Sequence, residues 1–358
     1  MDIIKICKAL RFTGELKSYE ILANGNINTT YHVITKHGSH EHEYLLQRIN
    51  KNVFKDPVAV MENIVNVTQY IINKYDSQDL KSLKFKTTED GSSYVIDDSG
   101  NFWRACQYFD CVTFDNPNDL KVIEEAGDAF GKFQYQLADF DATILHETIP
   151  NFHNTKVRIQ NLENAIAYSK TNRKELCFEE IGYILANKII AYKLCDMLEN
   201  GDLPLRVTHN DTKCNNVIFN KTTLKALAVV DLDTIMPGLT AYDFGDGARS
   251  ISCSTKEDEV DISKVCFDLN KFESFTKGFL KNLKYSLTKN EINTLSISVY
   301  IMTLELATRF LEDYLNGDVY FKIRYQNHNL DRTRCQIALC KDIWSKMDSI
   351  DKIIKKYC

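Results

Sequence analysis

Residues 207–233 read VTHNDTKCNNVIFNKTTLKALAVVDLD, and this segment carries the clearest pattern in the chain. It contains a His-x-Asp triplet that ends at Asp211, an Asn at position 216, and two β-branched runs, the second of which ends at Asp231. In this order and spacing, these residues are typical of a phosphoryl-transfer site. Asp211 can orient a hydroxyl nucleophile and accept its proton, while Asn216 and Asp231 can hold Mg²⁺ against the phosphates of a nucleotide.

The combination is more specific than its parts, because an Asp at a strand end is usually a turn or cap residue. No G-x-x-x-x-G-K-[ST] sequence occurs, which excludes P-loop kinases. We expect His209 to brace the loop rather than act as the base. Lys213 has two readings that the sequence leaves open: it neutralises charge near the transferred phosphoryl group, or it is a surface lysine.

Two further aspartates follow Asp231. Asp233 should point to the same side of an extended segment as Asp231, where it would bind a second metal ion or stabilise the loop. Asp243 begins the letters Asp-Phe-Gly of the protein-kinase metal motif, but it comes twenty-seven residues after Asn216. At that spacing we expect Asp243 to be a structural brace or helix cap.

The bulk composition indicates a globular protein with more than one domain. The chain has 358 residues, of which 44% are hydrophobic and 26% charged, enough for two cores. Its formal charge of −5 and the absence of long basic runs predict no nucleic-acid partner.

The cysteines and the N-terminus indicate the compartment. The eleven cysteines are scattered without metal-ligand spacing, which favours free thiols in a reducing environment. Charges interrupt the N-terminal apolar residues, and no apolar run looks long enough to span a bilayer. We therefore expect a cytoplasmic protein with no membrane partner.

The first hundred residues predict an antiparallel sheet. Strand patterns occupy residues 19–23, 31–35 and 44–49, and the first is followed by an Asn-Gly turn. The segment 24–30 between the first two strands is either an ordinary hairpin connection or a loop that covers nucleotide phosphates. The candidate phosphate contacts on it are Asn26, Asn28, Thr29 and Thr30.

A helix follows the third strand. Asp56 is a suitable N-cap, Pro57 fits the first helical position, and an apolar face recurs from Val60 onward. In a kinase-type lobe, a cation on the third strand pairs with a Glu on this helix, and Arg48 and Glu62 are the candidates. Gln47 beside Arg48 could take part, and purely structural roles for both charged residues remain open.

Beyond residue 113 helices dominate, so we expect an α+β, protein-kinase-like bilobal fold. Residues 1–112 would form a small lobe with an antiparallel sheet and one main helix, and residues 113–358 a larger, mostly helical lobe. A helix is expected over 118–138, where Gly127 and Gly131 allow close packing, and others near 156–169 and 175–199.

The acceptor would approach Asp211 from the helical lobe. Glu305 and Arg309 interrupt a largely apolar segment, 298–311, at a spacing of four residues. They form either an ordinary intrahelical ion pair or a site in which Arg309 binds the acceptor instead.

At the level of these motifs, the chain resembles the N-acetylhexosamine 1-kinases, a branch of the aminoglycoside phosphotransferase and choline kinase superfamily. The matching segments run from about residue 24 to about residue 336, and they read NGNINTTYHV, YLLQRINKNVFKDPVAVMENI, HNDTKCNNVIF, VVDLDTIMPGLTAYDFGDGAR, RFLEDYLNGDVYFKI and HNLDRTRCQ. The resemblance implies ATP- and Mg²⁺-dependent phosphorylation of the anomeric hydroxyl of a small-molecule sugar, N-acetylglucosamine or N-acetylgalactosamine.

The resemblance also implies site residues. It favours Arg309 and Tyr320 as substrate contacts beside Asp211, and it makes Asp246 a further candidate. Cys214 departs from the pattern, because a larger aliphatic residue is usual there; if exposed, it would be open to alkylation.

Two rival functions remain. The chain could phosphorylate another small hydroxyl acceptor, such as an aminoglycoside, choline or homoserine, although an Arg-rich downstream segment suits a neutral polyol better. It could also be a pseudokinase that binds nucleotide without turnover, but Asp211, Asn216 and Asp231 are all present.

Overall fold

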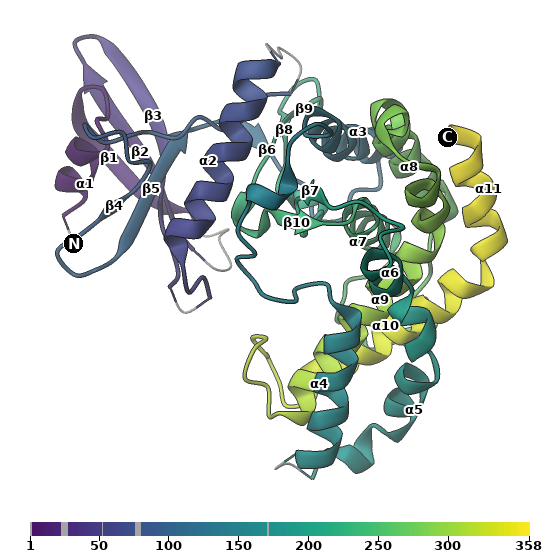
Figure 1. The fold of residues 1–358 in the computed structure, drawn as a ribbon. Helices are drawn as coiled ribbons and strands as arrows, with labels where there is room; N and C mark the ends of the chain where they lie inside the picture. The colour runs from purple at the N-terminus through teal and green to yellow at the C-terminus, as the bar shows by residue number, and fades with distance from the viewer. Residues whose placement is uncertain (1, 23–27, 52, 76–79, 170–171) are drawn as a thin grey trace. The chain divides into compact units, whose positions relative to one another are not determined.

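The computed structural model describes residues 2–22, 28–51, 53–75, 80–169 and 172–358. It has an antiparallel sheet in its N-terminal part and mostly helices in its C-terminal part, which confirms the expected α+β fold (Figure 1). Two compact units divide the chain. The first comprises Met1–Val112, Thr143–Ile149 and Ile218–Met236, and the second comprises Thr113–Ala142, Pro150–Val217 and Pro237–Cys358. The division into lobes at residue 112 stays a prediction.

The first unit is built on a five-stranded antiparallel sheet with the order β1-β2-β3-β5-β4. The strands are β1 (Glu15–Leu22), β2 (Thr29–His37), β3 (His40–Arg48), β4 (Val95–Ile96) and β5 (Phe102–Gln107). Gly38, with a φ of 61°, closes the hairpin between β2 and β3. An isolated antiparallel bridge joins Phe85 to Cys106 of β5.

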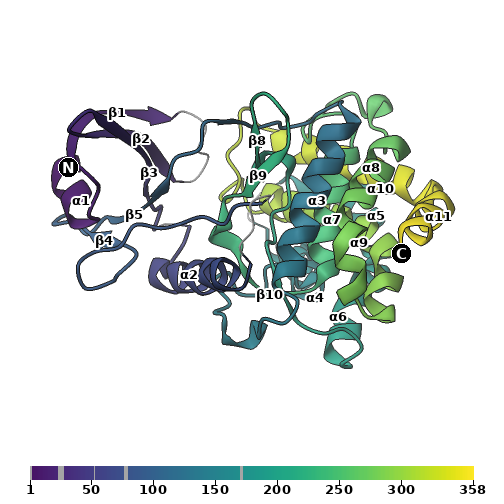
Figure 2. The ribbon, with the colours of Figure 1, turned by 90° about the horizontal axis from the view of Figure 1, so that it is seen from above.

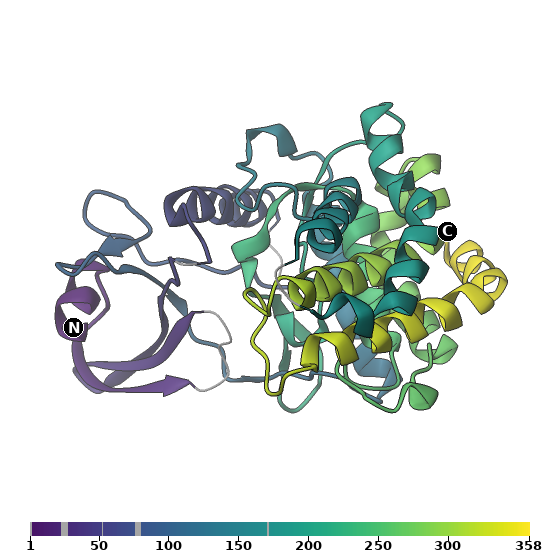
Figure 3. The same cartoon turned by 90° about the horizontal axis from the view of Figure 1, so that it is seen from below.

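One face of this sheet packs against α1 (Ile3–Ala9), which Asp2 caps (Figure 3). Alternate strand residues point to the same face, so the apolar residues of three strands reach the helix together. The buried cluster contains Ile3, Ile6, Cys7, Leu10, Phe12, Tyr31, Val33, Tyr44, Leu46, Trp103 and Ala105.

Helix α2 (Pro57–Lys74) forms as expected. The Asp56 carboxylate accepts hydrogen bonds from the backbone N–H groups of Val58 and Ala59, at 3.1 and 3.0 Å. The unit also contains a small sheet with the order β6-β8-β9, formed by β6 (Cys111–Val112), β8 (Val217–Asn220) and β9 (Ala226–Val229).

The second unit is helical. Its longer helices are α3 (Leu120–Gln136), α4 (Thr155–Tyr168), α5 (Phe178–Ala186), α6 (Lys188–Glu199), α7 (Thr240–Ser252), α8 (Leu269–Leu283), α9 (Lys289–Leu315), α10 (His328–Ser345) and α11 (Met347–Tyr357). The short strand β7 (Arg206–Thr208) precedes residues 209–216, and the short strand β10 (Met236–Gly238) precedes α7. The single helix expected over 175–199 is wrong, because the chain breaks at Asn187, whose side-chain amide donates to Tyr183 O at 2.8 Å.

Helix α9 is long and apolar enough to cross a bilayer by length and composition, although the sequence analysis expected no such run. Its most apolar window is 78% buried inside the protein. Val299, Leu304 and Leu311 are fully buried, as in the core helix of a globular unit.

Helices α3 and α8 approach closely because glycines line their contact, as expected for Gly127 and Gly131 (Figure 2). A Cβ built on Gly131 would lie 2.0 Å from Phe279 O, and one on Gly127 would lie 2.3 Å from Phe275 O. Gly278 on α8 is equally tight, since its Cβ would lie 2.1 Å from Glu124 O.

We expect Gly131→Ala to lower the free energy of unfolding by about 1–3 kcal/mol, because the new methyl group meets backbone that cannot move without separating the helices. Gly182→Ala is the matched control: a Cβ there meets nothing within 4 Å, so the gain in helix propensity should leave stability unchanged or slightly higher. Urea denaturation of both variants measures the difference, and equal stabilities would contradict close packing at Gly131.

Candidate active site

The segment 209–216, called here the Asp211 loop, is held by a buried carboxylate. Asp243, in the first turn of α7 and 1% exposed, accepts hydrogen bonds from the backbone N–H groups of His209 and Asn210 at 2.9 and 2.7 Å. The side-chain amide of Gln134 is a third donor, at 2.5 Å. Asp243 is therefore a structural brace, as expected from its spacing.

His209 fixes the start of the loop. Its ring is fully buried, edge-on to Phe130 with a centroid distance of 5.6 Å, and its Nδ1 accepts a hydrogen bond from the backbone N–H of Asp211 at 3.3 Å. Asn210 between them has a φ of 63°, in the left-handed region that Asn tolerates. These contacts confirm that His209 braces the loop.

Donors surround the carboxylate of Asp211. Lys213 Nζ lies 3.3 Å from Oδ1, and the side-chain amide of Asn216 donates to Oδ2 at 3.1 Å and to the backbone carbonyl of Asp211 at 2.8 Å. The Asp211 side chain is 31% exposed, so it can also contact an acceptor hydroxyl. Because Asn216 turns its nitrogen towards Asp211, its Oδ1 is the atom that it can offer to a cation.

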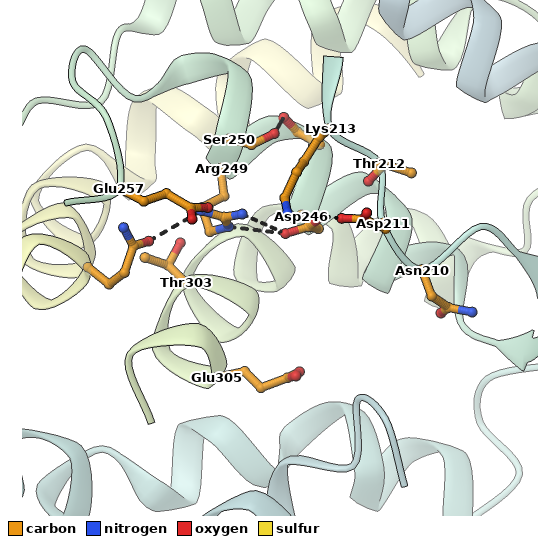
Figure 4. A network of polar contacts seen from close by, with 12 residues as sticks. Asn210, Asp211, Thr212, Lys213, Asp246, Arg249, Ser250, Glu257, Thr303 and Glu305 are labelled. Atoms are coloured by element: carbon orange, nitrogen blue, oxygen red, sulfur yellow. Dashed lines mark hydrogen bonds and ion pairs between the residues drawn. The ribbon is translucent and has the colours of Figure 1, made fainter. Parts of the chain in front are cut away.

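Lys213 lies near the carboxylates of Asp211, Asp246 and Glu257 (Figure 4). Asp211 raises the pKa of Lys213 above its ordinary value; burial opposes this, and Glu257 and Asp246 reinforce it. The lysine therefore stays protonated, as its proposed role in neutralising phosphoryl charge requires.

Asp246 is held by Arg249, which is 1% exposed (Figure 4). Arg249 donates through Nε and Nη2 to Asp246 Oδ1 at 3.1 and 2.9 Å, and through Nη1 to Glu257 at 3.1 Å and to Gln336 at 3.3 Å. Burial raises the pKa of Asp246, but Arg249 and Lys213 outweigh it and the pKa is lowered. Asp246 is thus a carboxylate whose Oδ1 is engaged by Arg249, and its contact with an acceptor stays a prediction.

Glu305 forms the intrahelical ion pair with Arg309, one of the two readings of the sequence, but it lies closer to a histidine. Both of its carboxylate oxygens lie 3.0 Å from Nδ1 of His153, whereas Arg309 Nη1 is 3.9 Å from Oε1. The main partner of Glu305 is therefore His153, which lies 152 residues away in the sequence.

Arg309 and Tyr320 come together, as the resemblance implies. The Arg309 guanidinium lies over the rings of Phe152, Phe321 and Tyr320, with centroid distances of 5.0, 5.7 and 6.0 Å. No hydrogen bond from this guanidinium to another residue is found in the described ranges. The Arg309 side chain is 15% exposed, and a substrate contact stays a prediction.

The backbone that carries Tyr320 is tied to Asp313. The Asp313 carboxylate accepts the N–H groups of Val319, Tyr320 and Phe321 at 2.9, 2.8 and 2.9 Å. Asn329 donates to the same carboxylate at 2.9 Å. A single buried side chain thus fixes the turn after α9.

The expected pair between Arg48 and Glu62 does not form among the described residues. Arg48 Nη2 donates to Thr29 Oγ1 at 3.3 Å, and Glu62 Oε2 lies 2.6 Å from His146 Nε2. The reason is strand alternation: Arg48 shares the sheet face of Tyr44 and Leu46, which packs on α1. Nucleotide contacts by Arg48 and Glu62 stay predictions.

The opposite face of the sheet carries a network of hydrogen-bonded polar side chains. Arg104 on β5 pairs with Asp233 and donates through Nε to Gln47 Oε1 at 3.0 Å, and Gln47 donates to Thr30 Oγ1 at 3.2 Å. Arg104 Nη1 also lies 3.7 Å from Met61 Sδ on α2. Arg104 was missed by the sequence analysis; the signal was an arginine within the apolar strand FWRACQ.

Asn28 belongs to the same hydrogen-bond network. Its side-chain amide donates to Asp233 Oδ2 at 2.7 Å, and its Oδ1 accepts the N–H of Asn50 at 2.9 Å. The candidate phosphate contacts Asn28, Thr29 and Thr30 therefore lie in the described part of the first unit, whereas Asn26 lies outside the described residues.

Asp231 lies two residues after Val229, the last residue of β9, and has a φ of 59°, in the left-handed region. The expectation of an extended segment through Asp233 is wrong, because residues Leu232–Thr234 form a 3₁₀ turn. Asp233 is consequently committed to Arg104 and Asn28, which favours the loop-stabilising reading over a second metal site.

The oxygen atoms of two candidate ligands are of the type that Mg²⁺ prefers. Asn216 offers an amide oxygen and Asp231 a carboxylate, the hard oxygen ligands that this cation prefers. Asn216 belongs to the second unit and Asp231 to the first, and their convergence on one ion stays a prediction.

Cys214 is 1% exposed, and burial raises its pKa to about 12. It is an inert filler of the loop rather than a site for alkylation.

Comparisons with known proteins give a matching family and similar folds. The model of the phosphotransferase enzyme family matches residues 18–265, more than half of the 358 residues. A microcompartment-associated aminopropanol kinase is similar in structure over 98% of this chain and 99% of its own, with a TM-score of 0.63 and 14% identity. Choline kinase from Cryptosporidium parvum is similar over 97% of this chain and 96% of its own, with a TM-score of 0.59 and 13% identity. A spectinomycin phosphotransferase in complex with ADP and spectinomycin is similar over 95% of this chain and 94% of its own, with a TM-score of 0.51 and 12% identity.

Proposed function

Since the chain belongs to the phosphotransferase enzyme family and is thus a small-molecule phosphotransferase, we propose that it phosphorylates the anomeric 1-hydroxyl of N-acetylhexosamines, with ATP as donor and Mg²⁺ as cofactor. The resemblance of residues 24–336 to the N-acetylhexosamine 1-kinases supports this substrate. ADP in the similar spectinomycin phosphotransferase supports the nucleotide.

The observation that carries the proposal is the environment of Asp211. Its carboxylate is partly exposed, and the cationic Lys213 and the amide of Asn216 hold it in one orientation. The acceptor hydroxyl donates its hydrogen bond to Asp211. Its oxygen then forms a bond to the γ-phosphorus in line as the bond to the departing ADP oxygen breaks, and Asp211 receives the proton.

The other residues of the Asp211 loop serve the same transfer. Lys213, kept protonated by its acidic neighbours, balances negative charge on the transferred group. Asn216 and Asp231 would hold the Mg²⁺, which neutralises the phosphates when bound.

The surroundings of Arg309 favour a neutral, oxygen-rich acceptor. Burial, and after it the positive charge of Arg309, lowers the pKa of Arg158, so two guanidinium groups share this region. The rings of Phe152, Tyr320 and Phe321 face Arg309, which occupies the position that a substrate ammonium would take over an aromatic ring. Sugar hydroxyls or an acetamido carbonyl could accept from Arg309 instead.

A second candidate is phosphorylation of an amino alcohol. The carboxylate of Asp246, near the ammonium of Lys213, is the observation that favours it, because a carboxylate suits a cationic acceptor. The similar solved structures include choline and aminopropanol kinases.

A substrate panel separates the two. With ATP and Mg²⁺, the purified protein should convert N-acetylglucosamine or N-acetylgalactosamine to a 1-phosphate, identified by ³¹P and ¹H NMR, and should leave choline and aminoglycosides unchanged. A 6-phosphate, or turnover of amino alcohols alone, would refute the proposed substrate.

Asp211→Asn should lower kcat by roughly 10²- to 10⁴-fold and leave ATP binding nearly unchanged, because only the proton acceptor is lost. Single-turnover rates and ATP titration measure the two effects. Asp261→Asn, at an exposed carboxylate, is the control and should keep wild-type kcat. A loss below tenfold for Asp211→Asn would remove it from the catalytic role.

Arg309→Ala should raise the KM for the sugar more than the KM for ATP, because the fork of N–H donors is removed from the acceptor side. Arg324→Ala is the matched control, since its side chain is 79% exposed and it should change neither constant. Equal effects of Arg309→Ala on both substrates in initial-rate kinetics would argue against a sugar contact.

A further inference from the structure

We propose that His153 is a positioning residue for the Asp211 loop: it carries a proton on both ring nitrogens and donates one N–H to Glu305 and the other to the carbonyl of Asn210. The catalytic part of this inference rests on the proposed phosphoryl transfer. Its protonation part can be tested without any substrate.

The geometry links three distant segments of the second unit. His153 precedes α4, Glu305 lies in the middle of α9, and Asn210 directly precedes Asp211. Nδ1 of His153 is 3.0 Å from both Glu305 oxygens, and Nε2 is 3.3 Å from the Asn210 carbonyl oxygen. All three residues are buried.

Both ring nitrogens of His153 face acceptors, and this decides its protonation. A carboxylate and a carbonyl each need a donor, but a neutral imidazole has only one N–H. With one proton, the ring would point a lone pair at one of the two oxygens in a buried site. The doubly protonated ring satisfies both oxygens and pairs its positive charge with Glu305.

The neighbouring charges act in both directions: the carboxylates of Glu305 and Asp246 favour an imidazolium, whereas the guanidinium groups of Arg309 and Arg158 oppose it. Besides Glu305, α9 presents Arg309, α7 presents Asp246 and Tyr242, and α4 presents Arg158. Burial raises the pKa of Glu305, but the positive charge of His153, helped by the two arginines, outweighs it and the pKa is lowered. Asp246 gains a smaller lowering of its pKa from the same ring.

The contact with Asn210 completes the support of the loop. Asp243 holds the N–H groups of His209 and Asn210, and His153 holds the carbonyl of Asn210, which belongs to the peptide that leads into Asp211. Because Asn210 has a left-handed φ of 63°, that peptide needs support from both sides. Losing the His153 donor would let the Asp211 carboxylate sample other directions.

His328 provides an internal contrast in the same unit. It is also buried against a carboxylate, with Nε2 3.1 Å from Asp258 Oδ2, but its Nδ1 accepts the backbone N–H of Arg324 at 3.2 Å. One donor and one acceptor suit a neutral ring with its proton on Nε2.

¹⁵N NMR of the imidazole rings in the full chain, assigned with His153→Ala and His328→Gln, tests the protonation at neutral pH. We expect a doubly protonated His153 and a neutral His328 with its proton on Nε2. A neutral His153 would overturn the proposal whatever substrate the enzyme uses.

Kinetics test the positioning role with the acceptor that the panel identifies. His153→Ala should lower kcat by roughly 10- to 100-fold, the scale of one charge-assisted hydrogen bond, with little change in the KM for ATP. Glu180→Gln is the control, because that buried carboxylate pairs with Arg334 at 2.6 Å, away from the loop, and wild-type kcat is expected. Wild-type kcat in a folded His153→Ala protein would overturn the role.

Glu305→Gln keeps the test decisive if His153→Ala does not fold. The introduced amide can donate to Nδ1, so His153 should become neutral with its proton on Nε2, keep the Asn210 contact and retain kcat within about threefold. A ring protonated only on Nδ1 together with full kcat would show that the Asn210 contact is dispensable and would refute the proposal.

Discussion

The Asp211 loop depends on one buried carboxylate. Asp243 accepts the N–H groups of two successive loop residues and the amide of Gln134. A carboxylate this deeply buried is tolerated only when donors surround it, so the loop and the side chain need each other. The directions of Asp211, Lys213 and Asn216 all follow from that bond set, because the backbone that carries them begins there.

Charges beyond the loop alternate in sign. Lys213 lies between the carboxylates of Asp211 and Asp246, and Arg249 lies between those of Asp246 and Glu257. Arg249 and Asp246 are largely buried, and each has an opposite charge beside it, which is the condition under which such groups keep their charge away from water. Lys213, Asp211 and Glu257 are partly exposed.

Local patterns predicted local structure well. The Asp56 cap and the glycine face of α3 depend on spacings within one helix, and both were predicted from sequence. The bracing roles of His209 and Asp243 were also predicted, although the bond from His209 to Asp243 joins residues 34 positions apart. The failures involve residues far apart. The pairing of Arg104 with Asp233 spans 129 residues, and periodicity in either segment gives no sign of the other.

The expected pairing of Arg48 with Glu62 failed for a different reason: a shift of one position along a strand changes the face, so Gln47 and not Arg48 shares the side of Arg104. The four-residue spacing of Glu305 and Arg309 left two readings open, and the ion pair within the helix does form, at 3.9 Å. A helix surface cannot show that a histidine from another segment lies nearer.

The turn after α9 owes its shape to Asp313, which binds three successive backbone N–H groups and no side chain of that turn. These bonds to the backbone do not depend on the side chains of Val319 and Tyr320, whereas the Phe321 ring packs against Phe310 with a centroid distance of 4.6 Å. The turn can therefore keep its backbone shape when the exposed side chains of Val319 and Tyr320 are exchanged.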